Sequence, residues 1–242
     1  MKIGYVTSFD IPLKQDVKFA KGSFDFLEVC IDPKNSRKEY KTEFPVMGHL
    51  FWERDMTAQA SDVFTEIKKL SALGAKVVTI HPTHKKMEIK KLIHLNINGI
   101  RKIAEFSAKY NIKLLLENCS DPVFSRPEPL LHIIRECGLY GMTFDIGHAR
   151  KRDTLESFFE KEVSSKIKHA HLHAVRNGID HLVYKNKAEF SEDLKIIRKM
   201  KNIKSVSFEF FAALRNGAKE QLTYADRKGH LLRYLKLYSE LR

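Results

Sequence analysis

Eight short apolar segments recur along the chain and alternate with longer segments of helical pattern, and this repetition limits the fold more than any other feature. The apolar segments span residues 3–8, 26–31, 46–51, 76–81, 112–118, 141–146, 167–173 and 205–210. Apolar runs of this length are typical of strands that are buried in a parallel sheet. A strand–helix unit repeated eight times predicts an α/β fold, a (β/α)8 TIM barrel with right-handed crossovers.

The expected helices span residues 58–73, 88–110, 127–137, 154–163 and 190–200, with a last helix from about Ala218. Ser125 and Glu128 form a capping-box pattern around Pro127, which suits the first position of a helix. Gly74 and Gly138 stand where the preceding helices should end.

The chain has 242 residues, the size of one barrel, and no linker, repeat or low-complexity segment divides it. Residues 1–242 are therefore expected to form a single domain. The first two crossovers, 9–21 and 32–43, are charged and irregular, so we expect loops there with at most short helices.

The cysteines and the first residues predict a soluble, cytoplasmic, unprocessed protein. Cys30, Cys119 and Cys137 are widely spaced and form no CxxC pair, which suggests neither a disulfide framework nor a zinc ribbon. The chain opens directly as a strand, and no segment approaches the roughly 18 apolar residues that a membrane span needs. No membrane partner is expected, and no pattern indicates an oligomeric state.

Lysine and arginine number 43 against 30 aspartates and glutamates, a formal net charge of +13. This excess favours anionic partners such as phosphorylated metabolites or a nucleic-acid backbone. A lysine-rich solvated surface explains the charge equally well. Several basic residues follow predicted strands and so place positive charge on the expected catalytic face: Lys85, Lys86, Arg150, Lys151, Arg152, Arg176, Lys185 and Lys187.

Seven of the eight predicted strands end in a residue of metal-binding or acid/base type. These residues are Glu28, His49, His81, Glu117, Asp145 with His148, His171 with His173, and Glu209. Any one of them alone is more often a capping or ion-pairing group. Closing the barrel brings all the strand ends to one mouth, where the carboxylates would repel one another unless a cation neutralised them. Oxygen and imidazole ligands without thiolate suit Zn²⁺, Mn²⁺, Co²⁺ or Mg²⁺.

The histidines of the seventh strand alternate, so His169, His171 and His173 share one face. We expect His171 to be the ligand, His173 to lie at the rim and His169 to lie in the core. Gly147 permits a sharp turn that lets Asp145 and His148 both face the mouth. The remaining histidines, in helices or loop tips, are expected at the surface: His84, His94, His132 and His230.

These segments resemble the xylose isomerase-like barrel superfamily, which includes endonuclease IV and many sugar or sugar-phosphate isomerases and epimerases. The matching segments, in the family's order, are Phe26-Leu27-Glu28, Gly48-His49, Ile80-His81-Pro82, Leu116-Glu117-Asn118, Phe144-Asp145-Ile146-Gly147-His148, His171-Leu172-His173, Asp180-His181-Leu182 and Phe208-Glu209. They extend over nearly the whole chain. The resemblance therefore implies the barrel and a metal site at its mouth.

The isomerase and epimerase branch implies one metal ion held by four residues: Glu117, Asp145, His171 and Glu209. Glu117 and Glu209 would also act as acid and base at a carbon next to a carbonyl, on a small anionic sugar-type substrate. The residues expected to contact that substrate are Glu28, Trp52, His173 and Arg176.

The endonuclease IV branch implies a zinc cluster that uses the same four ligands together with His49, His81, His148 and His181. All eight are present, which suits phosphodiester hydrolysis in a nucleic acid. The ninth ligand position of that family, an aspartate, falls on Ile179, and Asp180 is displaced by one. We therefore expect one or two ions of Zn²⁺, Mn²⁺ or Co²⁺ and no intact third site.

Three functions remain open from the sequence. The first choice is a metal-dependent sugar or sugar-phosphate isomerase or epimerase. The alternative is a zinc-dependent apurinic/apyrimidinic endonuclease or another phosphodiesterase. The third is a barrel that has lost catalysis and serves in binding.

Overall fold

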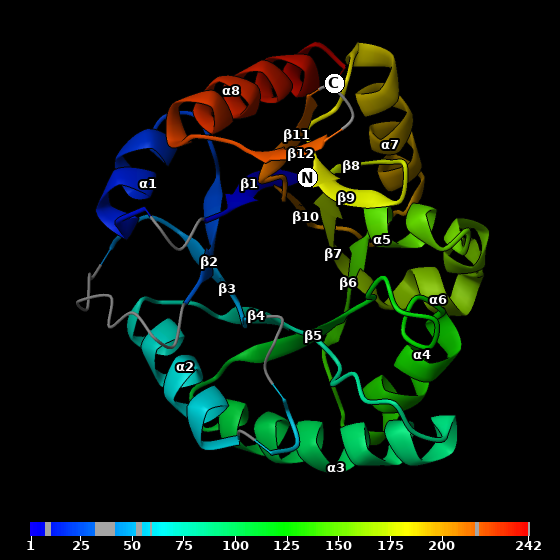
Figure 1. The fold of residues 1–242 in the computed structure, drawn as a ribbon. Coiled ribbons are helices and arrows are strands. Elements are labelled where there is room, and N and C mark those ends of the chain that lie inside the picture. The colour runs from blue at the N-terminus through cyan, green and yellow to red at the C-terminus, as the bar shows by residue number, and fades with distance from the viewer. Residues whose placement is uncertain (8–10, 32–41, 52–54, 59, 216–217, 242) are drawn as a thin grey trace.

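The computed structural model describes residues 1–7, 11–31, 42–51, 55–58, 60–215 and 218–241. Eight strands form a closed barrel in the order β1-β10-β7-β6-β5-β4-β3-β2, and every neighbouring pair is parallel (Figure 1). These strands are β1 (Lys2–Val6), β2 (Phe26–Cys30), β3 (Val46–His49), β4 (Val77–Ile80), β5 (Lys113–Glu117), β6 (Gly141–Asp145), β7 (Ile167–Leu172) and β10 (Ser205–Phe208). The predicted (β/α)8 barrel is confirmed.

Helices surround the barrel (Figure 1). They are α1 (Leu13–Ala20), α2 (Ala60–Ala72), α3 (Ile89–Ala108), α4 (Pro127–Glu136), α5 (Ile146–Lys151), α6 (Lys161–Lys166), α7 (Lys187–Lys199) and α8 (Tyr224–Glu240), with a short 3-10 helix at Leu155–Phe159. In α3, the longest, Leu92, Asn96, Ile100 and Ile103 follow the spacing of one helical face and are all buried. None of the described helices is long and apolar enough to cross a membrane.

A second sheet, absent from the sequence predictions, stands on the mouth of the barrel (Figure 1). Its strands come from the segments after β7 and β10: β8 (Ala174–Arg176), β9 (Ile179–Leu182), β11 (Ala212–Arg215) and β12 (Ala218–Gln221). Asn177 and Gly178 join β8 to β9 with φ of 53° and 72°, the positive values of a type I′ hairpin turn. The Asn-Gly pair was thus the sequence signal for this hairpin.

Three predicted boundaries were wrong. The last helix begins at Tyr224, not Ala218, because residues 218–221 pair with β11 as a strand. The single helix expected over 154–163 is two shorter elements. The capping box at Ser125 does not form: the helix follows Arg126 without a side-chain cap, although Pro127 does occupy its first turn.

The predicted helix stops are confirmed, since Gly74 and Gly138 both have positive φ immediately after α2 and α4. The first crossover contains the eight-residue helix α1, which agrees with the expected short helix. Most of the second crossover lies outside the described residues.

Candidate metal centre

Four buried side chains from neighbouring strands converge at the mouth of the barrel. Glu117 ends β5, Asp145 ends β6, His171 lies near the end of β7, and Glu209 directly follows β10. One ligand atom from each lies within 4.8 Å of the others. Nδ1 of His171 lies 2.9 Å from Oε2 of Glu209, 3.3 Å from Oε1 of Glu117 and 3.9 Å from Oδ2 of Asp145. The quartet implied by the resemblance is therefore brought together.

The electrostatics of this quartet fit a cation. Both carboxylate oxygens of Glu117, Oε2 of Glu209 and Nδ1 of His171 are buried and make no hydrogen bond within the described part of the chain. Leaving such polar atoms unpaired is costly. Burial raises the pKa of Glu117, but the neighbouring His171 and His81 outweigh it and hold that pKa well below its usual value. The side chain is thus an anion at neutral pH, and its oxygens are available as ligands.

A buried glutamate supports the histidine from below. Glu28 accepts hydrogen bonds from Nε2 of His171, at 3.0 Å, and from Nε2 of His169, at 2.9 Å. An ionised carboxylate only accepts, so Nε2 of His171 carries a hydrogen and Nδ1 is the nitrogen that faces a metal, which on binding would displace the proton that the surrounding carboxylates stabilise there. Burial raises the pKa of Glu28, but the charges of the two histidines dominate and hold it well below its usual value.

This placement corrects one predicted role and confirms another. Glu28 is fully buried beneath the quartet, so its side chain positions His171 and cannot contact a substrate in the cavity. His169 is buried as expected, with Nδ1 2.8 Å from Oγ of Ser205.

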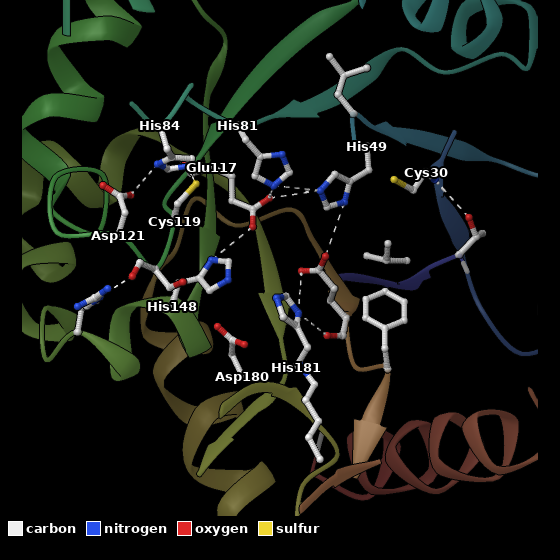
Figure 2. Close-up of a pocket in the computed structure, with 18 of the residues that line it drawn as sticks. Cys30, His49, His81, His84, Glu117, Cys119, Asp121, His148, Asp180 and His181 are labelled. Carbon is white, nitrogen blue, oxygen red and sulfur yellow. Dashed lines mark hydrogen bonds and ion pairs between the residues drawn. The ribbon is translucent and has the colours of Figure 1, made fainter. Parts of the chain in front are cut away.

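A second cluster adjoins the quartet through Glu117. Nε2 of His49 and Nε2 of His81 lie 3.3 Å apart, and both approach Oε2 of Glu117, at 3.6 and 3.2 Å (Figure 2). Nδ1 of both rings is buried without a hydrogen bond to any described residue. His49, His81 and Glu117 can therefore hold an ion that shares Glu117 with the quartet.

A third group, His148, His173 and His181, is weaker as a metal site. Both ring nitrogens of His173 are engaged: Nε2 lies 3.0 Å from Oδ2 of Asp145, and the backbone N–H of His181 lies 3.0 Å from Nδ1. Burial and the charge of His173 lower the pKa of His181 to about 4, so this imidazole is neutral. His173 is fully buried and not at the rim where it was expected, and its contact with substrate stays a prediction.

The displaced aspartate does not complete this third group. Asp180 forms an ion pair with Lys151, with Nζ 2.8 Å from Oδ2. Burial raises the pKa of Asp180, but the hydrogen bond from Lys151 outweighs it and lowers the pKa to about 2. The neighbouring residue Ile179, at the position where the resemblance implies the ninth ligand of the endonuclease IV branch, has an apolar side chain.

A cavity of about 860 Å³ opens above these clusters. Glu117 and Glu209 border it, and three basic residues add positive charge to its wall: Arg152, Lys219 and Arg227. Sequence reasoning missed Lys219, which β12 carries over the mouth, and Arg227, which reaches in from α8 with only 3% of its surface exposed. Arg227 donates through Nε to the carbonyl of Phe210 at 3.1 Å.

Most of the other predicted basic residues are neutralised in ion pairs away from the cavity. Arg176 pairs with Glu189 at 3.0 Å and donates to the carbonyl of Val183 at 2.7 Å, and its contact with substrate stays a prediction. Lys85 pairs with Asp55 at 2.7 Å. Trp52, the remaining predicted substrate contact, lies outside the described residues.

Residues 47–226 match the model of the xylose isomerase-like TIM barrel family. Two uncharacterized proteins of Methanocaldococcus jannaschii, MJ1614 and MJ1311, are 27% and 32% identical over 142 and 121 residues. The alignments cover 57% and 45% of this chain and 56% and 40% of those proteins, so the chain spans about half the length of the curated relatives it matches.

Three solved structures share the fold. A D-tagatose 3-epimerase-like protein has a TM-score of 0.69 at 21% identity, over 100% of both chains. D-Psicose 3-epimerase, crystallised in the presence of D-fructose, has a TM-score of 0.67 at 14% identity, over 99% of this chain and 98% of that one. The IOLI protein with a bound zinc atom has a TM-score of 0.69 at 14% identity, over 100% and 96%. With most of its length matched by the family model, the chain belongs to the xylose isomerase-like TIM barrel family.

Proposed function

We propose that this protein is a divalent-metal-dependent isomerase or epimerase that moves a proton at a carbon next to a carbonyl in a small anionic sugar-type substrate. The placement of two glutamates carries the proposal. Glu117 and Glu209 both border the cavity, and both approach Nδ1 of His171, at 3.3 and 2.9 Å. Proton transfer at a single carbon needs one group to accept the proton and a second to return it.

The carboxylate oxygens required for these transfers are not occupied by hydrogen bonds to the described residues. Oε1 and Oε2 of Glu117 and Oε2 of Glu209 make no hydrogen bond to any described residue. Burial raises the pKa of Glu209, but the charge of His171 outweighs it and keeps the pKa below its usual value. Both glutamates are therefore ionised at neutral pH, which is the state a general base requires, and the second glutamate must take up a proton from solvent before it can return one to the carbon.

Depth in the barrel separates the roles of the four residues. Asp145 and His171 are 0% exposed and lie beneath the cavity, whereas the two glutamates border it. Asp145 and His171 then act as ligands only, and Glu117 and Glu209 also exchange protons with the substrate. A divalent ion in this quartet, Zn²⁺, Mn²⁺ or Co²⁺, supplies polarisation of the substrate's carbonyl and hydroxyl oxygens.

The cavity suits a small anion. Its volume of about 860 Å³ falls within the range of roughly 300–1,000 Å³ that small-molecule sites occupy. Arg152, Lys219 and Arg227 supply positive charge to the wall, which favours a phosphorylated or carboxylated sugar over a neutral one. The likeness to an epimerase crystallised with D-fructose supports the sugar class.

The test measures deuterium exchange. Metal-loaded protein is incubated with aldose and ketose phosphates in deuterated water, and mass spectrometry follows deuterium at the carbon next to the carbonyl. We expect incorporation that Glu117→Gln and Glu209→Gln each abolish. Glu66→Gln is the matched control, because Glu66 is equally buried but lies on α2, outside the cavity. Exchange that survives both glutamine substitutions would refute the assignment.

A second candidate, a metal-dependent phosphodiesterase, is favoured by one observation. His49 and His81 lie within 3.6 Å of Oε2 of Glu117, so a second ion can share that carboxylate with the quartet. Paired ions suit in-line displacement at phosphorus, because one activates the water and the other stabilises the leaving oxygen.

The same preparations distinguish this candidate. They are incubated with a duplex that carries one abasic site, over a range of salt concentrations. Strand cleavage that is lost in His49→Ala and falls steeply with salt would replace the isomerase proposal, since a protein covering about four phosphates shows a log–log slope near −0.9 per phosphate. Under the isomerase proposal, no cleavage above the metal-free background is expected.

A further inference from the structure

A further group of metal-ligand side chains lies at the rim of the cavity, outside the clusters described above. It consists of His84, Cys119 and Asp121, from the segments that follow β4 and β5. One ligand atom of each lies within 4.8 Å of the others, and all three line the cavity. Figure 2 shows them side by side, with Glu117 turned away from them toward His81.

The carboxylate is held in place by the backbone. Oδ1 of Asp121 accepts from the N–H groups of Val123 and Phe124, at 2.9 and 3.0 Å. This fixes Oδ2 toward Nδ1 of His84, 3.3 Å away. Oδ2 is buried and makes no hydrogen bond to a described residue, so it remains available as a ligand.

The other two ligands are also anchored. The N–H of Cys119 donates to the carbonyl of Phe124 at 3.1 Å, which closes the loop that carries both Cys119 and Asp121. Thr83, next to His84, exchanges two hydrogen bonds with the buried side chain of Asn96, at 2.7 and 3.0 Å. The ring of His84 packs edge-on against Phe124. The three side chains are therefore held in place by two loops, whose positions these hydrogen bonds fix.

We propose that His84, Cys119 and Asp121 form a separate metal site for a thiophilic divalent cation of the Zn²⁺ class. A thiolate, an imidazole and a carboxylate are all zinc ligands, and three protein ligands leave the fourth tetrahedral position open. Here that position faces the cavity, because all three residues line it. On binding, the thiol proton of Cys119 is released to solvent and the sulfur bonds to the cation.

Cobalt provides a specific probe. Co²⁺ bound by a thiolate gives an intense near-ultraviolet charge-transfer absorption, which the nitrogen and oxygen ligands of the other clusters cannot produce. Titration of metal-free protein with Co²⁺ should produce this absorption, and Cys119→Ser should abolish it while lowering the number of bound Co²⁺ by one. Cys30→Ser is the matched control, because Cys30 is equally buried and also lines the cavity.

His84→Ala and Asp121→Asn keep the thiol and provide a check that is independent of any folding defect in the cysteine variant. Each should weaken Co²⁺ binding at this site at least tenfold without changing the spectrum of the central ions. Absence of the charge-transfer absorption at saturating Co²⁺ would overturn the proposal, and so would its loss in Cys30→Ser. An absorption that His84→Ala and Asp121→Asn leave unchanged would also overturn it.

Discussion

Glu28→Gln tests how the barrel orients His171, the histidine of the proposed metal site. The carboxylate of Glu28 accepts from two imidazoles at once, His171 and His169. A glutamine side chain of the same shape has one accepting oxygen, and in either orientation its NH₂ group faces Nε2 of His171, because both oxygens of Glu28 lie within 3.1 Å of that nitrogen. His169 has a second partner in Ser205, whereas Nδ1 of His171 faces only ligand carboxylates. The substitution should therefore disturb His171 and its tautomer.

The expected magnitude follows from the bond that is lost. Partners that orient a metal ligand from the second layer contribute about 10- to 100-fold in metal affinity, which corresponds to about 1.4–2.8 kcal/mol. The charge-assisted hydrogen bond from His171 to Glu28 falls in the same range, about 1.5–3 kcal/mol. Competition with a chelator of known affinity, monitored for Zn²⁺, measures the change directly.

Asp193→Asn provides the control for a general loss of stability. Asp193 is also a buried carboxylate with two partners, Arg150 and Tyr184, but it lies on α7, away from the quartet. We expect it to lower the unfolding temperature and leave metal affinity unchanged. If Glu28→Gln binds Zn²⁺ within twofold of the parent, or if both variants lose affinity equally, then Glu28 does not orient the ligand.

The other predictions concern ion number and packing. Stripping the protein with a chelator should lower its unfolding temperature, and Zn²⁺ at 100 times its Kd should restore about 2.7 kcal/mol; scanning calorimetry measures this. If His49 and His81 hold a second ion, His49→Ala should lower the number of bound ions by one in elemental analysis, and an unchanged count would exclude them as ligands. Gly147→Ala should destabilise the fold by about 1–3 kcal/mol in urea unfolding, because its Cβ would lie 2.0 Å from the ring of His173. Gly229→Ala, in α8 with open space around it, should instead stabilise by about 0.5–1 kcal/mol, and equal effects at the two glycines would refute the packing argument.

The barrel and the convergence of its strand ends could be predicted, because both depend on local patterns. Apolar runs mark the strands, and closure of a parallel barrel places all their carboxyl ends at one mouth. That rule brings Glu117, Asp145, His171 and Glu209 to the mouth with the other strand-end residues, and the family resemblance then selects these four as one group.

The depth of each side chain could not be predicted. Glu28 occupies the middle of β2, with Val6 and Met47 as its neighbours in the sheet, so it lies below the mouth rather than in it. The surroundings of His173 and Arg176 were not predicted for another reason. Arg176 ends β8 and His173 directly precedes it, in a sheet whose pairing also joins β9 to β11, segments about 30 residues apart, and no local pattern records such a contact.

The barrel closes along a seam between its first and last strands, with Lys2 beside Ser205 and Tyr5 beside Phe208. During synthesis on the ribosome, β1 can pair with β10 only after nearly the whole chain has been made. Glu209 emerges directly after that last strand, so the fourth member of the quartet is made only as the seam can form. Contacts of such long sequence separation form late, because loop-closure entropy opposes them. Tight metal binding by a nascent chain would therefore show that its barrel has closed.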